Sequence, residues 1–144
     1  MKKDVWLGIS STQKFEDMPP EHIDLVTQAT LYKRNGKFYI SYQESELTGL
    51  GDTRTTVKAD GKNVTMIRTG DFPSQMTFAE NECHVGLYHT FGMAMTISTR
   101  TSKVDNTLGE EGGKLVIDYA IEIDNNLAGR HHFEMTVSTD PMKC

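Results

Sequence analysis

Apolar and polar residues alternate along almost the whole chain, which is the pattern of β-strands that bury one face. Ten segments share this alternation, are rich in Thr, Val, Ile, Tyr and Phe, and are separated by turn residues. They cover residues 4–14, 22–33, 37–47, 53–59, 63–69, 74–80, 83–90, 93–101, 113–124 and 130–139. We find no segment with the helical period of about 3.6 residues. The pattern therefore predicts an all-β protein, a closed antiparallel up-and-down β-barrel of about 8–10 strands.

Three short turns predict how neighbouring strands pair. Asn35-Gly36 is the strongest hairpin signal, because both central positions of a type I′ turn require positive φ. Asp60-Gly61 is nearly as strong, and Asn81-Glu82 is weaker. Counting outward from these turns predicts the pairs Leu31 with Ile40, Thr27 with Glu44, Thr55 with Met66, Thr53 with Arg68, Phe78 with Val85, and Ser74 with His89.

The same alternation brings polar side chains to one end of the inner face. In FYISYQESE, residues 38–46, the face that carries Ile40 and Tyr42 goes on to carry Glu44 and Glu46. An unpaired carboxylate inside an apolar barrel costs several kcal/mol, whereas water reaches it at an open end. We therefore predict that these acids mark the mouth of the barrel. The predicted mouth cluster is Tyr42, Glu44, Glu46, Thr53, Arg68, His89 and His131, and Ser74 shares its face.

This cluster combines groups that suit a small ligand. Arg68 can hold a carboxylate or a phosphate bidentately while an apolar tail enters the barrel. Inward methionines such as Met66 and Met76 form either a deformable pocket or ordinary core, because methionine adapts to irregular space. The first hypothesis is a barrel that binds a small amphiphilic or anionic ligand at its mouth.

Other interpretations of the cluster stay open. Polar residues at a barrel end meet solvent and need no function, and Glu44 and Arg68 could pair only to hold strands together. An enzyme could use a carboxylate beside an imidazole as an oriented base, but no nucleophile stands out and no catalytic residue can be assigned. A solidly packed barrel would instead be a structural or interaction protein.

Composition and charge narrow the partners. The chain has 144 residues, which predicts a single domain over residues 1–144. Its 15 Lys and Arg against 20 Asp and Glu give a net charge of −5, which argues against a nucleic-acid partner and against a membrane surface. The histidines lack metal-ligand spacing, so we expect no metal and no cofactor. The oligomeric state is not specified by the sequence.

The N-terminus and the cysteines bear on location. MKKDVWLGISSTQKF lacks the continuous apolar run of a signal peptide. Cys83 and Cys144 are too far apart in sequence for a Cys-x-x-Cys site and too few for a disulfide framework. We therefore expect a cytoplasmic protein.

The order and spacing of several segments carry a resemblance to a known family. These segments are FYISYQESELTGLG followed by TRTTVK, then MIRTG, QMTF, YHTFGMAMTISTRTS and LVIDY, between about residues 22 and 139. The chain resembles the YwiB-like family of uncharacterised bacterial β-barrel proteins, whose fold is similar to that of the calycins, the group of lipocalins and fatty-acid-binding proteins. The resemblance implies a closed calycin-like barrel and a cytoplasmic bacterial protein, and it carries over no catalytic residues. It favours ligand binding by analogy of fold alone.

Overall fold

Ten antiparallel strands form a closed barrel in the part of the chain that the computed structural model describes, residues 2–15, 17–44, 52–71, 73–90, 93–123 and 126–139. For residues 87–90, 93–95 and 126 the description covers the backbone alone. The strands are β1 (Lys2–Phe15), β2 (Glu21–Arg34), β3 (Lys37–Gln43), β4 (Thr53–Asp60), β5 (Asn63–Gly70), β6 (Ser74–Ala79), β7 (Cys83–Thr90), β8 (Met93–Asn106), β9 (Gly112–Ile123) and β10 (Asn126–Ser138). Each strand pairs with its neighbours in sequence, and β1 closes the barrel against β10. The predicted up-and-down barrel is confirmed.

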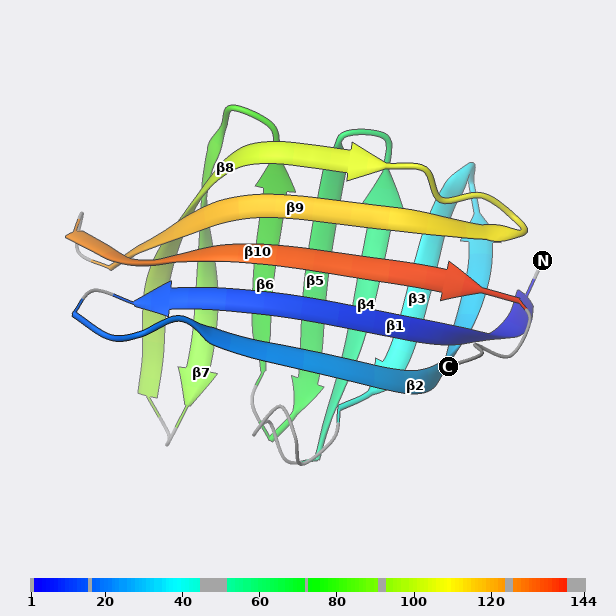
Figure 1. Cartoon of the computed structure of the whole chain (residues 1–144), viewed down its shortest axis with the longest axis horizontal. Coiled ribbons are helices and arrows are strands. Elements are labelled where there is room, and N and C mark those ends of the chain that lie inside the picture. The colour runs from blue at the N-terminus through cyan, green and yellow to red at the C-terminus, as the bar shows by residue number, and fades with distance from the viewer. Residues whose placement is uncertain are drawn as a thin grey trace.

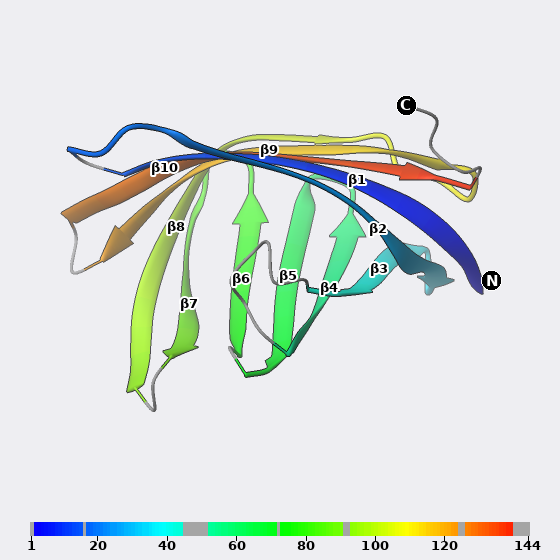
Figure 2. The same cartoon turned by 60° about the horizontal axis from the view of Figure 1, so that its bottom comes forward.

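The barrel is flattened into two layers of strands that cross steeply (Figure 1). The long strands β1, β2, β9 and β10 form one layer, and each has 12 to 14 residues. The shorter strands β3 to β7, with six to eight residues each, form the other layer. In a turned view the long strands lie across the short ones (Figure 2). The arrangement is that of orthogonally packed sheets joined at their corners.

β8 joins the two layers, because its first part pairs with β7 and its second part with β9. The pairing with β9 shifts between Thr101 and Lys103, as in a β-bulge, which bends a strand. Buried Thr99 and Thr101 are consequently followed by buried Val104, three residues further on. This break in the alternation explains why the predicted strand stopped at residue 101, whereas β8 continues to Asn106.

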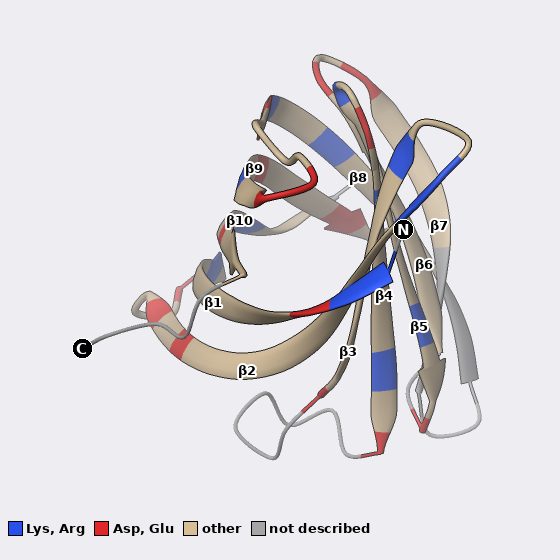
Figure 3. Cartoon of the chain, turned by 90° about the vertical axis from the view of Figure 1, so that its right-hand side faces the viewer, with Lys and Arg blue, Asp and Glu red and all other residues tan. Residues whose placement is uncertain are grey.

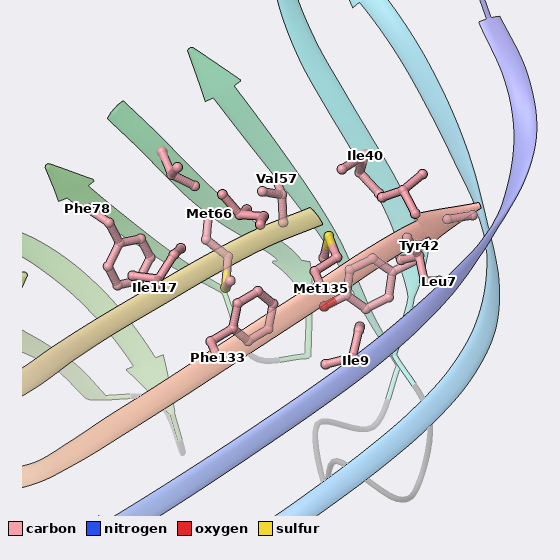
Figure 4. Close-up of a cluster of buried hydrophobic side chains, with 14 of the residues drawn as sticks. Leu7, Ile9, Ile40, Tyr42, Val57, Met66, Phe78, Ile117, Phe133 and Met135 are labelled. Atoms are coloured by element: carbon pink, nitrogen blue, oxygen red, sulfur yellow. The ribbon is translucent and has the colours of Figure 1, made fainter. Parts of the chain in front are cut away.

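The C-terminal ends of β1, β3, β5, β7 and β9 all lie at one end of the barrel, because the strands alternate in direction. We call this end the mouth. Away from it, side chains from both layers point toward one another and form the core (Figure 4). The fully buried members include Leu7, Leu31, Ile40, Val57, Val64, Phe78, Leu115, Ile117 and Met135. Burial of one such side chain stabilises the fold by about 2 kcal/mol.

The hairpin between β2 and β3 confirms the strongest turn prediction but is shorter than expected. The two residues of Asn35-Gly36 have φ of 53° and 78°, as a type I′ turn requires. Pairing ends with Thr30 and Ser41, so the predicted pair of Thr27 with Glu44 does not form. Beyond this point the strands part, because β2 belongs to the layer of long strands and β3 to the crossing layer.

The turn between β4 and β5 was predicted one position too early along the chain. Asp60 pairs with Asn63, so the central residues are Gly61 and Lys62. Gly61 has a φ of 58° and Lys62 has no positive φ, which fits a type II′ turn with Gly at its first central position. The register shifts by two residues, and the inward face is unchanged because side chains alternate with a period of two. The observed pairs are Thr53 with Gly70, Thr55 with Arg68, and Val57 with Met66.

The turn between β6 and β7 was predicted wrongly, and here the face changes. Three residues, 80–82, connect the strands where two had been expected, and Ser74 pairs with Tyr88 in place of His89. A shift of one residue moves a strand's side chains to the other face. Val85, which had been expected opposite Phe78 in the core, is 69% exposed.

Candidate functional site

A cavity of about 440 Å³ opens at the mouth and is lined from both layers. The apolar part of its wall includes Ile9, Leu25, Met66, Met76, Ile97 and Phe133. The polar part includes Ser11, Gln13, Tyr42, Glu44, Arg68 and His131. Four members of the predicted mouth cluster thus line the same cavity, although they come from β5, β10 and the end of β3. The barrel is packed at one end and hollow at the other.

The other members of the predicted cluster are placed differently. Thr53 is fully buried, and its carbonyl oxygen accepts a hydrogen bond of 2.8 Å from the backbone N–H of Glu44. Ser74 is buried opposite Arg68 in the pairing of β5 with β6. Glu46 lies outside the described residues. The side chain of His89 also lies outside them, and its backbone pairs with Ala94 of β8.

Glu44 is more deeply buried than a carboxylate at a solvent-filled rim would be. Its side chain is 2% exposed, which corrects the expectation that water surrounds it. The hydroxyl of Thr55 donates a hydrogen bond of 2.5 Å to Glu44 Oε1, and Arg68 Nε lies 3.9 Å from the same oxygen. Tyr42 also forms a side-chain hydrogen bond with Glu44. Because a buried charge requires partners, these two hydrogen bonds and the nearby cation permit a carboxylate here.

Arg68 has donor capacity that Glu44 leaves unused. Its side chain is 19% exposed, and its Nε is buried without a hydrogen-bond partner in the described part of the chain. The separation of 3.9 Å from Glu44 is too long for a hydrogen bond. A guanidinium presents several N–H groups in one plane, which suits a carboxylate or phosphate. Arg68 is therefore able to accept a second acidic partner from the cavity.

Two tyrosines stand close to the Arg68 guanidinium. Burial and then the negative charge of Glu44 raise the pKa of Tyr42, while the charge of Arg68 opposes the rise. Burial raises the pKa of Tyr119 to about 12, again opposed by Arg68. Both phenols therefore stay protonated at neutral pH. The site holds an acid, a guanidinium and two hydroxyl groups next to an apolar wall.

His131 forms an aromatic side of the same cavity. Its ring stacks on Tyr119 with a centroid distance of 4.9 Å and an interplanar angle of 8°, and the edge of Phe15 approaches at 5.6 Å. Desolvation by burial lowers the pKa of His131 to about 4, so the ring is neutral at neutral pH. Its Nε2 is buried without a hydrogen-bond partner among the described residues.

Sequence reasoning missed two residues of the site for different reasons. Tyr119 was not included in the predicted mouth cluster, because nothing local in the sequence relates it to Arg68. Thr55 was paired with Met66 through the misplaced turn. Gly61 carried the signal that could have corrected this, since a Gly at the first central position of a type II′ turn sets Thr55 opposite Arg68.

The described residues lack two further kinds of feature, a metal site and a membrane-spanning helix. Among them no group of three or more His, Cys, Asp and Glu side chains is arranged to hold a metal ion. They also contain no helix with the length and apolar character needed to cross a membrane.

The family model described as a domain of unknown function, DUF1934, matches residues 8–135. The chain belongs to this family. The description of DUF1934 assigns no reaction or ligand, so the cavity and its residues have to be interpreted from their own chemistry.

Both the sequence and the fold of this chain are similar to those of a bacterial β-barrel protein. The chain is 25% identical over 121 residues to the uncharacterized beta-barrel protein YwiB of Bacillus subtilis (strain 168), and the match covers 84% of each protein. The crystal structure of the ywiB protein from Bacillus subtilis superposes with a TM-score of 0.86 at 23% identity, covering 97% of this chain and 94% of that one. The predicted resemblance to YwiB-like barrels is confirmed, and the structural likeness shows the fold.

Proposed function

We propose that this DUF1934 barrel binds a small amphiphile with an anionic head group. The head group would meet Arg68, and the apolar tail would occupy the cavity. One observation supports this above the others: the buried Arg68 Nε, which has no hydrogen-bond partner among the described residues, belongs to a side chain that lines a largely apolar cavity of about 440 Å³. Small-molecule sites commonly combine an apolar wall with a few such polar groups.

Glu44 lowers the affinity of the proposed site for an anion but leaves Arg68 able to bind one. The carboxylate lies 3.9 Å from Arg68 Nε and is hydrogen-bonded to Thr55, so it offsets part of the positive charge. The guanidinium keeps further N–H groups for a ligand. Removing the charge of Glu44 should therefore strengthen the binding of an anion, because the two acids share one cation.

The apolar wall should set the preferred chain length. Met66 and Met76 are flexible side chains that adapt to irregular ligands. Each buried methylene group contributes about 0.8 kcal/mol, which is roughly a fourfold gain in affinity. Affinity should rise with tail length until the cavity is filled and then level off.

Thermal unfolding with matched amphiphiles tests the proposal. Decanoate should raise the melting temperature by roughly 5–10 °C at a concentration 100 times its Kd. Decanol, which has the same tail without a charge, should raise it less, and butyrate should have little effect. A melting temperature that none of these compounds changes would contradict the proposal.

Variants of the two charged residues make the test specific. Arg68→Met should abolish the advantage of decanoate over decanol, and Glu44→Gln should increase the affinity for decanoate several-fold. Arg130→Gln, which removes an exposed arginine on β10, is the matched control and should behave as the parent protein. Equal loss of decanoate binding in Arg68→Met and Arg130→Gln would mean that the anion binds elsewhere.

Catalysis is the weaker candidate for this site. An imidazole whose pKa is about 4 is a poor proton acceptor at neutral pH, and Glu44 is already held by Thr55 and Arg68. Ligand binding requires neither group to change its protonation state. The predicted cytoplasmic location, which would give the barrel access to small metabolites, stays a prediction.

A further inference from the structure

A second hollow lies on the outer surface, where β2 and β3 are paired only over Thr30–Arg34 and Lys37–Ser41. A groove of about 460 Å³ lies over this paired part of the two strands. Its lining includes Lys2, Thr30, Tyr32, Arg34, Ser41 and Arg54. None of these residues lines the mouth cavity. We call this hollow the seam groove.

The seam groove gathers positive charge that nearby acids do not neutralise. Lys2, Arg34 and Arg54 come from three different strands, and among the described residues none of them has a carboxylate oxygen within 4.0 Å. Viewed from the N-terminal side, blue segments lie on β1, on the hairpin of β2 and β3, and on β4 (Figure 3). Asp4, an exposed acid, lines the adjoining hollow. The chain as a whole has a net charge of −5, so this positive cluster contrasts with the negative charge of the rest of the molecule.

Other surface cations of the same barrel show the contrast. Arg100 lies 3.2 Å from Glu122, and Lys33, which also lines the groove, lies 3.5 Å from Glu110. Lys2, Arg34 and Arg54 therefore differ from these paired cations, and an anion in solution is a suitable partner for them.

Hydroxyl groups and an aromatic ring complete the groove. Arg54 Nε donates a hydrogen bond of 2.9 Å to Ser41 Oγ, which holds the guanidinium at the groove and leaves its terminal N–H groups available. Ser41 is 8% exposed and pairs with Thr30, so two hydroxyl residues lie side by side on neighbouring strands. Tyr32 stacks on Tyr39 with a centroid distance of 4.9 Å, which fixes the ring at the groove's side.

We propose that the seam groove binds the phosphate group of a small phosphate ester. Arginine forms paired hydrogen bonds with phosphate oxygens, lysine adds a compact charge, and hydroxyl groups donate to the remaining oxygens. The fixed ring of Tyr32 would contact the organic part of the ester. The site is independent of the mouth cavity and of the amphiphile proposed for it.

Calorimetric titration with inorganic phosphate and with phenyl phosphate tests this assignment. Phenyl phosphate, which has the same head group on a planar organic body, should bind more tightly than inorganic phosphate. Arg54→Gln and Arg34→Gln should each weaken phenyl phosphate binding about tenfold or more, since a hydrogen bond to a charged group is lost. Arg54→Lys should retain part of the affinity because it keeps the charge without the paired donors.

Controls separate a built site from general attraction. Arg130→Gln removes an exposed arginine from β10 and should leave phenyl phosphate binding unchanged. Each variant should keep the parent melting temperature and its response to decanoate, since the mouth cavity is untouched. No heat of binding with the parent protein, or an equal loss in Arg54→Gln and Arg130→Gln, would overturn the proposal. Tighter binding of inorganic phosphate than of phenyl phosphate would also overturn it.

Discussion

At the scale of single residues, the adjacent histidines 131 and 132 show how strand alternation creates opposite electrostatic environments. His131 points inward, and burial lowers its pKa to about 4. His132 points outward, and its contacts with Glu134 and Asp118 raise its pKa above the ordinary value of 6.5. Two histidines that are adjacent in sequence thus differ in the direction of their pKa shifts: the imidazole of His131 resists protonation, and that of His132 favours it.

This difference predicts opposite effects of pH on stability. Between pH 6.5 and about 4 the unfolded chain protonates residue 131 while the folded protein does not, so His131 makes stability fall as pH falls. His131→Phe, which keeps an aromatic ring against Tyr119, should flatten this slope by up to about 1.4 kcal/mol per pH unit. Urea unfolding over a pH series measures it.

The neighbouring residue supplies the control for that experiment. His132 binds its proton more tightly in the folded state, so its contribution is present below pH 6.5 and is lost as pH rises through its raised pKa. His132→Gln should therefore leave the slope between pH 6.5 and about 4.5 intact, because the pKa of Glu134, which His132 lowers, ordinarily lies at 4.5, and it should change the slope above pH 6.5. An acid slope that His131→Phe leaves as steep as in the parent would contradict the buried, neutral state of this ring.

At the scale of elements, local turns decide which face of a strand is buried. The observed turn at Gly61 shifts the register of β4 and β5 by two residues from the predicted one, which keeps the same side chains buried. The three-residue connection before β7 shifts the predicted register of β6 and β7 by one residue, which exposes Val85. Gly86 lies in β7 where this strand pairs with β6, and a Cβ at this position would lie 2.2 Å from the carbonyl oxygen of Gln75. The close approach of β6 and β7 therefore depends on a glycine.

A matched pair of valine substitutions tests the observed faces. Val64 is fully buried in β5, whereas Val85 in β7 is 69% exposed. Val64→Ala should lower the free energy of unfolding by about 2 kcal/mol, because it removes buried methyl groups and leaves a cavity. Val85→Ala should change it by less than about 0.5 kcal/mol. Denaturant melts compare the two, and similar losses would favour the register counted from Asn81-Glu82.

At the scale of the whole molecule, the crossing of the two layers leaves the barrel filled at one end and hollow at the other. Ser11 lines the hollow end, whereas its neighbour Ser10 pairs with Asp24 and Glu134 and lines a hollow on the outer surface. A larger side chain at Ser11 would fill the cavity without changing its charged residues, and the same change at Ser10 is the control. Filling space is a test of shape, independent of the head-group chemistry.

Ser11→Leu should keep or raise the melting temperature, since it buries apolar surface in existing space. It should also remove the stabilisation by decanoate, because the tail loses its room. Ser10→Leu should leave the decanoate response intact. Thermal melts with and without decanoate give both readouts. A Ser11→Leu protein that still responds fully to decanoate would place the tail outside the cavity.

Most of the fold and part of the site could be predicted from the sequence. The observed strands agree with the predicted ones to within a few residues, apart from the end of β8 and the start of β10. Residues 45–47 of the predicted strand 37–47 lie outside the described residues. Tyr42, Glu44, Arg68 and His131 were correctly assigned to the inner face, and they share a cavity. The depth of Glu44, the contact with Thr55 and the place of Tyr119 could not be predicted, because each depends on strands that are distant in sequence.

The sequence by itself determined the strands, the closed order and most inward faces, because alternation and turn chemistry act between residues that are close along the chain. The tertiary structure alone decided where the barrel is hollow, how deeply Glu44 is buried and where β2 and β3 part. These features follow from the angle at which the two layers cross. No local pattern encodes that angle, because it results from packing the whole inner face at once.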